Sequence, residues 1–123
     1  MMFPKINVSV KTTYLPEQTV PLQRYVYTYT ITIENVGGES AQLVSRHWRI
    51  RDANNNLQEV QGIGVVGEQP LIDPGKSYTY TSGVVLETET GIMEGTYQMR
   101  LSEGESFDAE IPTFALVPPN KLH

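Results

Sequence analysis

A strict alternation of side-chain types runs from Tyr25 to Ile33 and limits the fold of this chain more than any other feature. Tyrosine or isoleucine occupies every second position, while the positions between them hold one valine and three threonines. Side chains of a β-strand point alternately to opposite faces, so a period of two predicts a strand with one buried face. A second alternation, in which Ile6, Val8 and Val10 share one face, predicts another strand of this kind.

Similar segments follow along the chain, separated by turn-forming residues. We expect strands at residues 6–11, 25–33, 43–51, 57–60, 77–86, 96–101 and 107–116, with breaks that include Gly91 and Gly95. Pro112 interrupts the last strand, which predicts a bend, a bulge or an edge position there. About seven to eight short antiparallel strands predict one all-β domain over residues 1–123, built from two packed sheets.

Two aromatic residues make the expected architecture more specific. Trp48 is the only tryptophan and stands in the third predicted strand, where β-sandwiches commonly bury a tryptophan between their sheets. Tyr97 follows Gly95 and precedes Met99, a spacing typical of a tyrosine corner, whose hydroxyl bonds to backbone upstream. These positions predict an immunoglobulin or fibronectin type III-like β-sandwich. We expect residues 118–123 to form a flexible tail.

The composition limits the cellular compartment that we expect and excludes several classes of function. The chain has no cysteine, which excludes disulfides, thiolate metal sites and thiol catalysis. No stretch approaches the ~20 apolar residues of a membrane span, and the first residues lack a signal-peptide core, so we expect a cytoplasmic protein with no membrane contact. The net charge is −5, and residues 62–123 carry nine acidic against three basic residues. Such a surface repels phosphate backbones, so nucleic acid is not an expected partner.

One motif contrasts with the β-pattern. Residues 62–67 spell GIGVVG and so match G-x-G-x-x-G, the pattern of dinucleotide-binding loops. Those loops bind pyrophosphate at the start of a helix, whereas Glu68, Gln69 and Pro70 follow here and no helix is expected.

Two interpretations of this loop stay open. Gly62, Gly64 and Gly67 allow positive φ angles and tight bends between strands, or their amides form a nest that holds pyrophosphate or a nucleotide, with a divalent ion, in the absence of a helix. No lysine or arginine lies between residues 62 and 75 to neutralise such an anion. This lack favours the structural interpretation.

The same loop also offers a protein-docking surface. Ile63, Val65 and Val66 are apolar residues in a connection between strands, and exposed apolar patches often mark partner sites. If these side chains turn into the sandwich instead, the interpretation fails.

A second candidate surface lies on the Trp48 strand. His47, Arg49 and Arg51 share the face opposite Trp48, so they form a small basic strip. Pairing with nearby carboxylates on a solvated face is the simpler interpretation, and docking of an acidic or phosphorylated partner is the alternative. Arg46 has the same parity as Trp48, so we expect it at the rim of the sandwich with its stem on apolar surface.

Along nearly its whole length the chain resembles the ApaG family. The blocks that carry the resemblance are His47, Trp48, Arg49, Ile50 and Asp52; GIGVVGEQP at Gly62 to Pro70; Leu71, Pro74, Gly75, Tyr78, Tyr80, Ser82 and Gly83; and Gly91, Met93, Gly95, Tyr97 and Met99. The resemblance implies a fibronectin-type sandwich. It also implies partner binding, because related domains occur as binding modules in eukaryotic F-box and polymerase-interacting proteins, and an association with cobalt and magnesium resistance.

The residues themselves predict no chemistry. His47 and His123 stand in no recognisable arrangement with serine and carboxylate, and no ligand spacing predicts a metal site. We therefore expect a non-enzymatic module, without catalytic residues, metal or cofactor, that binds another protein through the glycine loop or an unpaired strand edge. An edge-to-edge homodimer also fits the sequence. The alternative is a small-ligand binder that holds pyrophosphate or a nucleotide on Gly62–Gly67.

Overall fold

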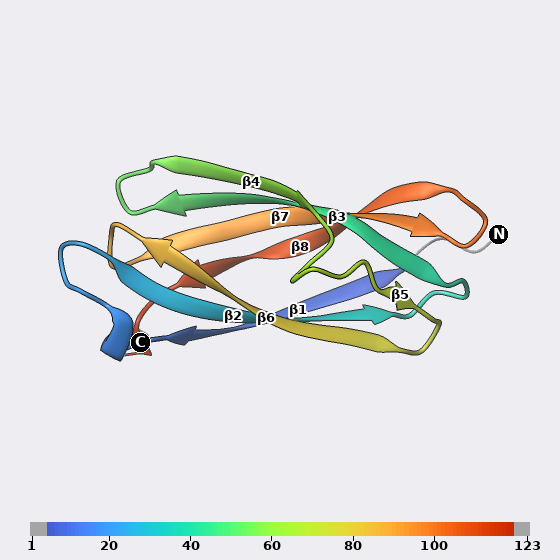
Figure 1. The fold of residues 1–123 in the computed structure, drawn as a ribbon, viewed down its shortest axis with the longest axis horizontal. Coiled ribbons are helices and arrows are strands. Elements are labelled where there is room, and N and C mark those ends of the chain that lie inside the picture. The colour runs from blue at the N-terminus through green and yellow to red at the C-terminus, as the bar shows by residue number, and fades with distance from the viewer. Residues whose placement is uncertain (1–4, 120–123) are drawn as a thin grey trace.

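The computed structural model describes residues 5–119, which form two antiparallel β-sheets packed face to face (Figure 1). One sheet has the strand order β1-β2-β6, and the other has the order β4-β3-β7-β8 with the short β5 paired to β3. This arrangement confirms the predicted β-sandwich. In chain order the elements are β1 (Ile6–Tyr14), the 3-10 helix η1 (Pro16–Gln18), β2 (Tyr25–Asn35), β3 (Ala41–Asp52), β4 (Leu57–Ile63), β5 (Leu71–Ile72), β6 (Ser77–Leu86), β7 (Gly91–Leu101) and β8 (Ser106–Leu116).

The core lies between the two sheets and follows the alternation in the sequence. On β2 the tyrosines and isoleucines of one parity are buried, and the threonines of the other parity are only partly covered on the outer face. Trp48 is 2% exposed, as predicted, and meets the rings of Tyr29 and Phe114 edge-on at centroid distances of 5.3 and 5.9 Å. Edge-to-face packing of this kind adds to the free energy gained from burial alone.

The prediction of a tyrosine corner at Tyr97 is wrong. Tyr97 lies in the middle of β7, and its hydroxyl shares a hydrogen bond of 2.5 Å with the hydroxyl of Tyr80 on β6, in the opposite sheet. Both side chains are buried, so this bond ties the two sheets together through the core. Burial raises the pKa of each phenol well above its usual range.

Most strands extend a few residues beyond the predicted bounds, and the largest difference is in β7. The sequence predicts a break at Gly95, but β7 runs continuously from Gly91 to Leu101 through it. A Cβ at Gly95 would lie 2.2 Å from the carbonyl oxygen of His47 on the neighbouring strand. Glycine is there because β3 and β7 approach closely, not because the chain turns.

Two irregularities shape the second sheet. Opposite Pro112, the register between β7 and β8 shifts between Met93 and Gly95, so Pro112 lies at a bulge of an edge strand, as predicted. A further register shift between Leu43 and Ser45 makes Val44 a bulge in β3. The edge of β3 pairs with β4 on one side of this bulge and with β5 on the other.

The sandwich closes on one side and opens on the other. The edge strands β1 and β8 contact each other, whereas two cavities open between the edge strands β4 and β6. Within residues 5–119 there is no helix long and apolar enough to cross a membrane. Of the predicted tail, Pro118 is buried, and residues 120–123 lie outside the described residues.

Candidate functional site

The glycine motif forms the tip of a two-residue β-hairpin. The amide of Val65 donates to the carbonyl of Glu68 at 2.8 Å, and the amide of Glu68 donates back to Val65 at 2.8 Å. Val66 and Gly67, the two residues between them, have φ angles of +43° and +83°. Positive φ at both central positions is the signature of a type I′ turn, the usual turn of such hairpins. We call residues 63–68 the hairpin tip. As predicted, no helix follows the motif.

The three motif glycines have different physical roles. Gly64 has a φ of +66°, and a Cβ there would lie 2.2 Å from the carbonyl oxygen of Glu68. Gly67 needs its positive φ but has open space around it. Gly62 is in β4 without a positive φ, so the expectation of a left-handed bend there is wrong. Its missing Cβ leaves room for the guanidinium of Arg46, whose Nη1 would lie 2.8 Å from a Cβ.

The apolar residues of the tip divide between core and solvent. Ile63 and Val66 are 77% and 56% exposed, whereas Val65 is 1% exposed and belongs to the core. The exposed apolar surface of the tip therefore consists of Ile63 and Val66, and Val65 cannot contribute to the predicted docking surface. The buried side chain of Val65 anchors the turn to the hydrophobic core.

Hydrogen bonds to two strands, β3 and β6, hold the tip in place. The carbonyl of Val44, at the bulge of β3, accepts from the amide of Gly64 at 2.8 Å and from Nε2 of Gln69 at 2.9 Å. Nη1 of Arg46 donates to the carbonyl of Gly64 at 2.7 Å. The hydroxyl of Tyr78 on β6 donates to Glu68 at 2.8 Å. Sequence reasoning missed these contacts, because they depend on the bulge at Val44 and on strand pairing.

The same hydrogen bonds bear on the anion-nest interpretation. The amides of Gly64, Val65 and Glu68 all donate to carbonyl oxygens of the protein. They are therefore not available to a bound phosphate in this conformation. Anion binding by Gly62, Gly64 and Gly67 stays a prediction that no feature of this geometry favours.

The basic strip lies on the outer face of the second sheet, as its parity predicts, and its charges have neighbours. His47 contacts Glu59 at 2.9 Å, and Nε of Arg49 donates to Glu94 at 3.1 Å, which lowers the pKa of that carboxyl. Nη1 of Arg51 donates to the side chain of Asn55 at 3.1 Å. Exposed pairs of this kind contribute little to stability. The strip therefore has the character of an ordinary solvated sheet face.

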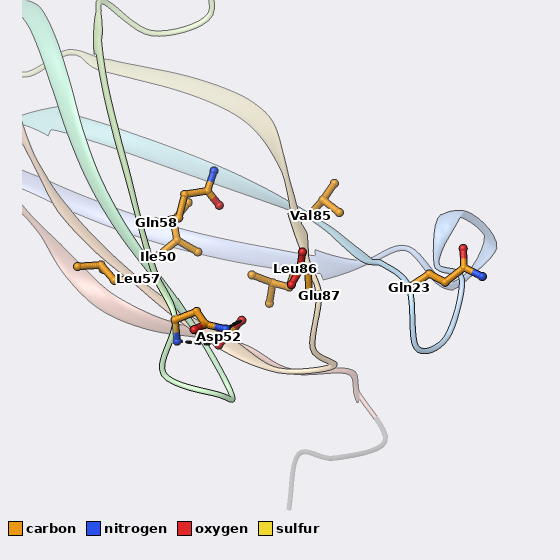
Figure 2. Close-up of a pocket in the computed structure, with 9 residues that line it drawn as sticks. Gln23, Ile50, Asp52, Leu57, Gln58, Val85, Leu86 and Glu87 are labelled. Carbon is orange, nitrogen blue, oxygen red and sulfur yellow. Dashed lines mark hydrogen bonds between the residues drawn. The ribbon is translucent and has the colours of Figure 1, made fainter.

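A carboxylate cluster that could hold a metal is absent from residues 5–119. Asp52 lies beside the larger cavity between β4 and β6, of about 480 Å³, with Leu57 and Glu87 (Figure 2). Its carboxylate accepts hydrogen bonds from the amides of Asn54 and Asn56, which lower its pKa. Asp52 thus closes the β3–β4 turn.

The fold and the tip together define a class: a β-sandwich domain that presents a rigid hairpin at one open edge. The ApaG domain model matches residues 16–101. A relative described as "Protein ApaG" from Thiobacillus denitrificans is 58% identical over 120 residues, which cover 97% of this chain and 94% of the relative. The "Protein ApaG" of Pseudomonas paraeruginosa is also 58% identical, with 97% and 95% covered. A crystal structure of a putative ApaA protein from Bordetella pertussis superposes with a TM-score of 0.93 at 45% identity, covering 96% of this chain and 97% of that one. This chain belongs to the ApaG family.

Proposed function

We propose that this domain is a non-enzymatic module that binds another protein through the hairpin tip. The observation that carries the proposal is the backbone conformation of Val66. A β-branched residue at a φ of +43° is strained, and asparagine followed by glycine is the usual choice for a type I′ turn. The residue at this position is nevertheless valine, and its side chain is 56% exposed. The strained backbone lowers the stability of the fold.

Rigidity and position support the same function. The tip is tied to β3 and β6 by hydrogen bonds, so its backbone is ordered before a partner arrives. Binding a pre-ordered surface avoids part of the entropy cost of association. Ile63, 77% exposed, adds apolar surface at the last residue of β4, an edge strand that could also pair with an extended segment.

We extend the proposal to the cobalt and magnesium association that the family resemblance implies. Any effect on ion resistance would act through the bound protein, because the described residues include no metal cluster.

Capture of partner proteins tests this proposal. The double substitution Ile63→Asp and Val66→Asp puts two charges on the tip, and we expect it to lower partner recovery from native lysate at least tenfold, because a desolvated charge opposes an apolar contact. The matched control is Leu22→Asp, which changes a 92% exposed apolar residue between β1 and β2. Quantitative mass spectrometry of the captured proteins gives the readout. Equal recovery with the tip variant and the control would contradict the proposal.

A further inference from the structure

A cavity of about 350 Å³ opens between β4 and β6. We call it the seam cavity. Arg46 and Trp48 on β3, Val60 on β4, and Ser82 and Val84 on β6 are among the residues that line it. Arg46 is the one charged residue among the described residues that line this cavity. Arg46 thus lies at the rim of the sandwich, at the opening between the edges of the two sheets, as its parity predicts.

The charge of Arg46 is not matched by a carboxylate. Among residues 5–119 the side-chain ion pairs are His47–Glu59 and Arg49–Glu94, and neither includes Arg46. Its hydrogen bonds, at 2.7 Å to Gly64 and 3.3 Å to Ile63, both come from Nη1. The Nε and Nη2 donors have no hydrogen-bond acceptor within the described chain. The Nη1 group thus fixes the guanidinium to the backbone, and the edge that carries Nε and Nη2 is free to bind a ligand.

The indole of Trp48 lines the same cavity. Its Nε1 is buried and has no acceptor among the residues that the structure describes. A Cβ on Gly95 of β7 would meet Cε3 of the indole at 3.2 Å, so that edge of the ring faces β7. Nε1 is on the opposite edge of the indole, away from β7, and it is covered by the protein. The ring of Trp48 therefore serves as a wall of the cavity and as a reporter of binding there.

The surroundings limit the kind of ligand. A single positive charge matches a carboxylate better than a phosphate dianion, and a guanidinium edge binds a carboxylate with two parallel bonds. Val60 and Val84 offer apolar walls to the rest of the molecule. The adjoining cavity shares Ile50, Gln58 and Val85 with this one but is lined by Asp52 and Glu87, which repel an anion (Figure 2). The anionic group therefore belongs at the Arg46 end.

We propose that the seam cavity is a binding site for a small carboxylic acid with an apolar body, whose carboxylate is held by the free edge of Arg46 and whose body lies against the indole of Trp48. Gly62 is part of this site, because a side chain there would displace the guanidinium. The proposal does not depend on the hairpin tip as a docking surface, since it concerns a small molecule in the cavity and not the exposed side chains of Ile63 and Val66.

Benzoate is a suitable probe, and the single tryptophan gives one indole N–H resonance to follow by NMR. We expect a saturable shift of that resonance with a dissociation constant on the order of 1 mM, a typical affinity for a fragment of this size. Benzamide, the uncharged analogue of the same shape, should produce no saturable shift. This comparison uses the unaltered protein, so it stands even where a variant fails to fold.

Two variants then assign the site. Arg46→Gln should weaken benzoate binding at least tenfold, as expected for loss of a charge-assisted pair. Arg49→Gln makes the same charge change on the opposite face of β3 and should leave binding unchanged. The proposal is overturned if benzoate causes no saturable shift, if benzamide binds equally well, or if Arg46→Gln retains the affinity.

Discussion

Replacing Gly95 by alanine is expected to destabilise the domain by about 3 kcal/mol, because the added methyl group would overlap the backbone of a paired strand. The Cβ would lie 2.2 Å from the carbonyl oxygen of His47 and 3.2 Å from the indole of Trp48. The first of these atoms belongs to the β3–β7 ladder, in which Gly95 pairs with Trp48. Neither strand can move away without losing hydrogen bonds in the middle of the sheet. Urea-induced unfolding of both chains measures the difference.

Gly83 provides the matched control for this substitution. It also lies inside a strand, but a Cβ there would meet its nearest atom, the carbonyl oxygen of Tyr27, at 3.8 Å, an ordinary contact. Gly83→Ala should therefore stabilise the domain by about 0.5 kcal/mol, through the lower entropy of its unfolded chain. A loss of similar size in both variants would contradict the view that Gly95 is fixed by close strand approach.

A steep loss of stability at alkaline pH is the second large effect. Burial raises the pKa of Tyr27, Tyr80 and Tyr97 in the folded domain, whereas an unfolded tyrosine has a pKa of about 10. Below that pH these phenols are neutral in both states and stability does not depend on them. Above it the unfolded chain releases protons that the folded domain keeps, so each phenol lowers the free energy of unfolding by about 1.4 kcal/mol per pH unit.

Three such phenols predict a slope of about 4 kcal/mol per pH unit above pH 10, which is large beside a typical domain stability of about 5–15 kcal/mol. The double variant Tyr80→Phe and Tyr97→Phe removes both partners of the hydrogen bond between the sheets, so it leaves no unpaired hydroxyl there. Its alkaline slope should fall to about a third of the original. Urea titrations at several pH values, with tyrosinate absorbance as a second readout, measure this. Unchanged slopes in the variant would show that these two phenols ionise normally in the folded domain.

Much of the fold could be predicted because the alternation on strands such as Tyr25–Ile33 depends on local chemistry alone. The position of Trp48 in the core and the bulge at Pro112 could be predicted for the same reason. The break predicted at Gly95 is wrong, because glycine occurs both at turns and where two backbones approach closely, and only the pairing of β3 with β7 distinguishes the two cases. The two-residue strand β5 is too short to show a period.

The candidate sites could be predicted less well, because their residues meet through the fold. The sequence predicts the same exposure for Ile63, Val65 and Val66. Only the type I′ turn shows that Ile63 and Val66 are exposed and Val65 is buried. Parity places Arg46 beside Trp48 correctly. Its contact with Gly64 depends on the Val44 bulge, which brings the loop back to β3.

The central claim is that Val66 is kept at the hairpin tip for binding and at a cost to folding. The direct test is Val66→Asn, with the free energy of unfolding and partner capture measured on the same preparation. We predict a gain in stability of about 1 kcal/mol, because asparagine adopts a positive φ more readily, together with loss of capture. Leu22 also has a positive φ, of +69°, but lies between β1 and β2, outside the hairpin tip. The variant Leu22→Asn should therefore be more stable as well but still capture the partner. A Val66→Asn domain that is no more stable, or one that retains its partner, would contradict the claim.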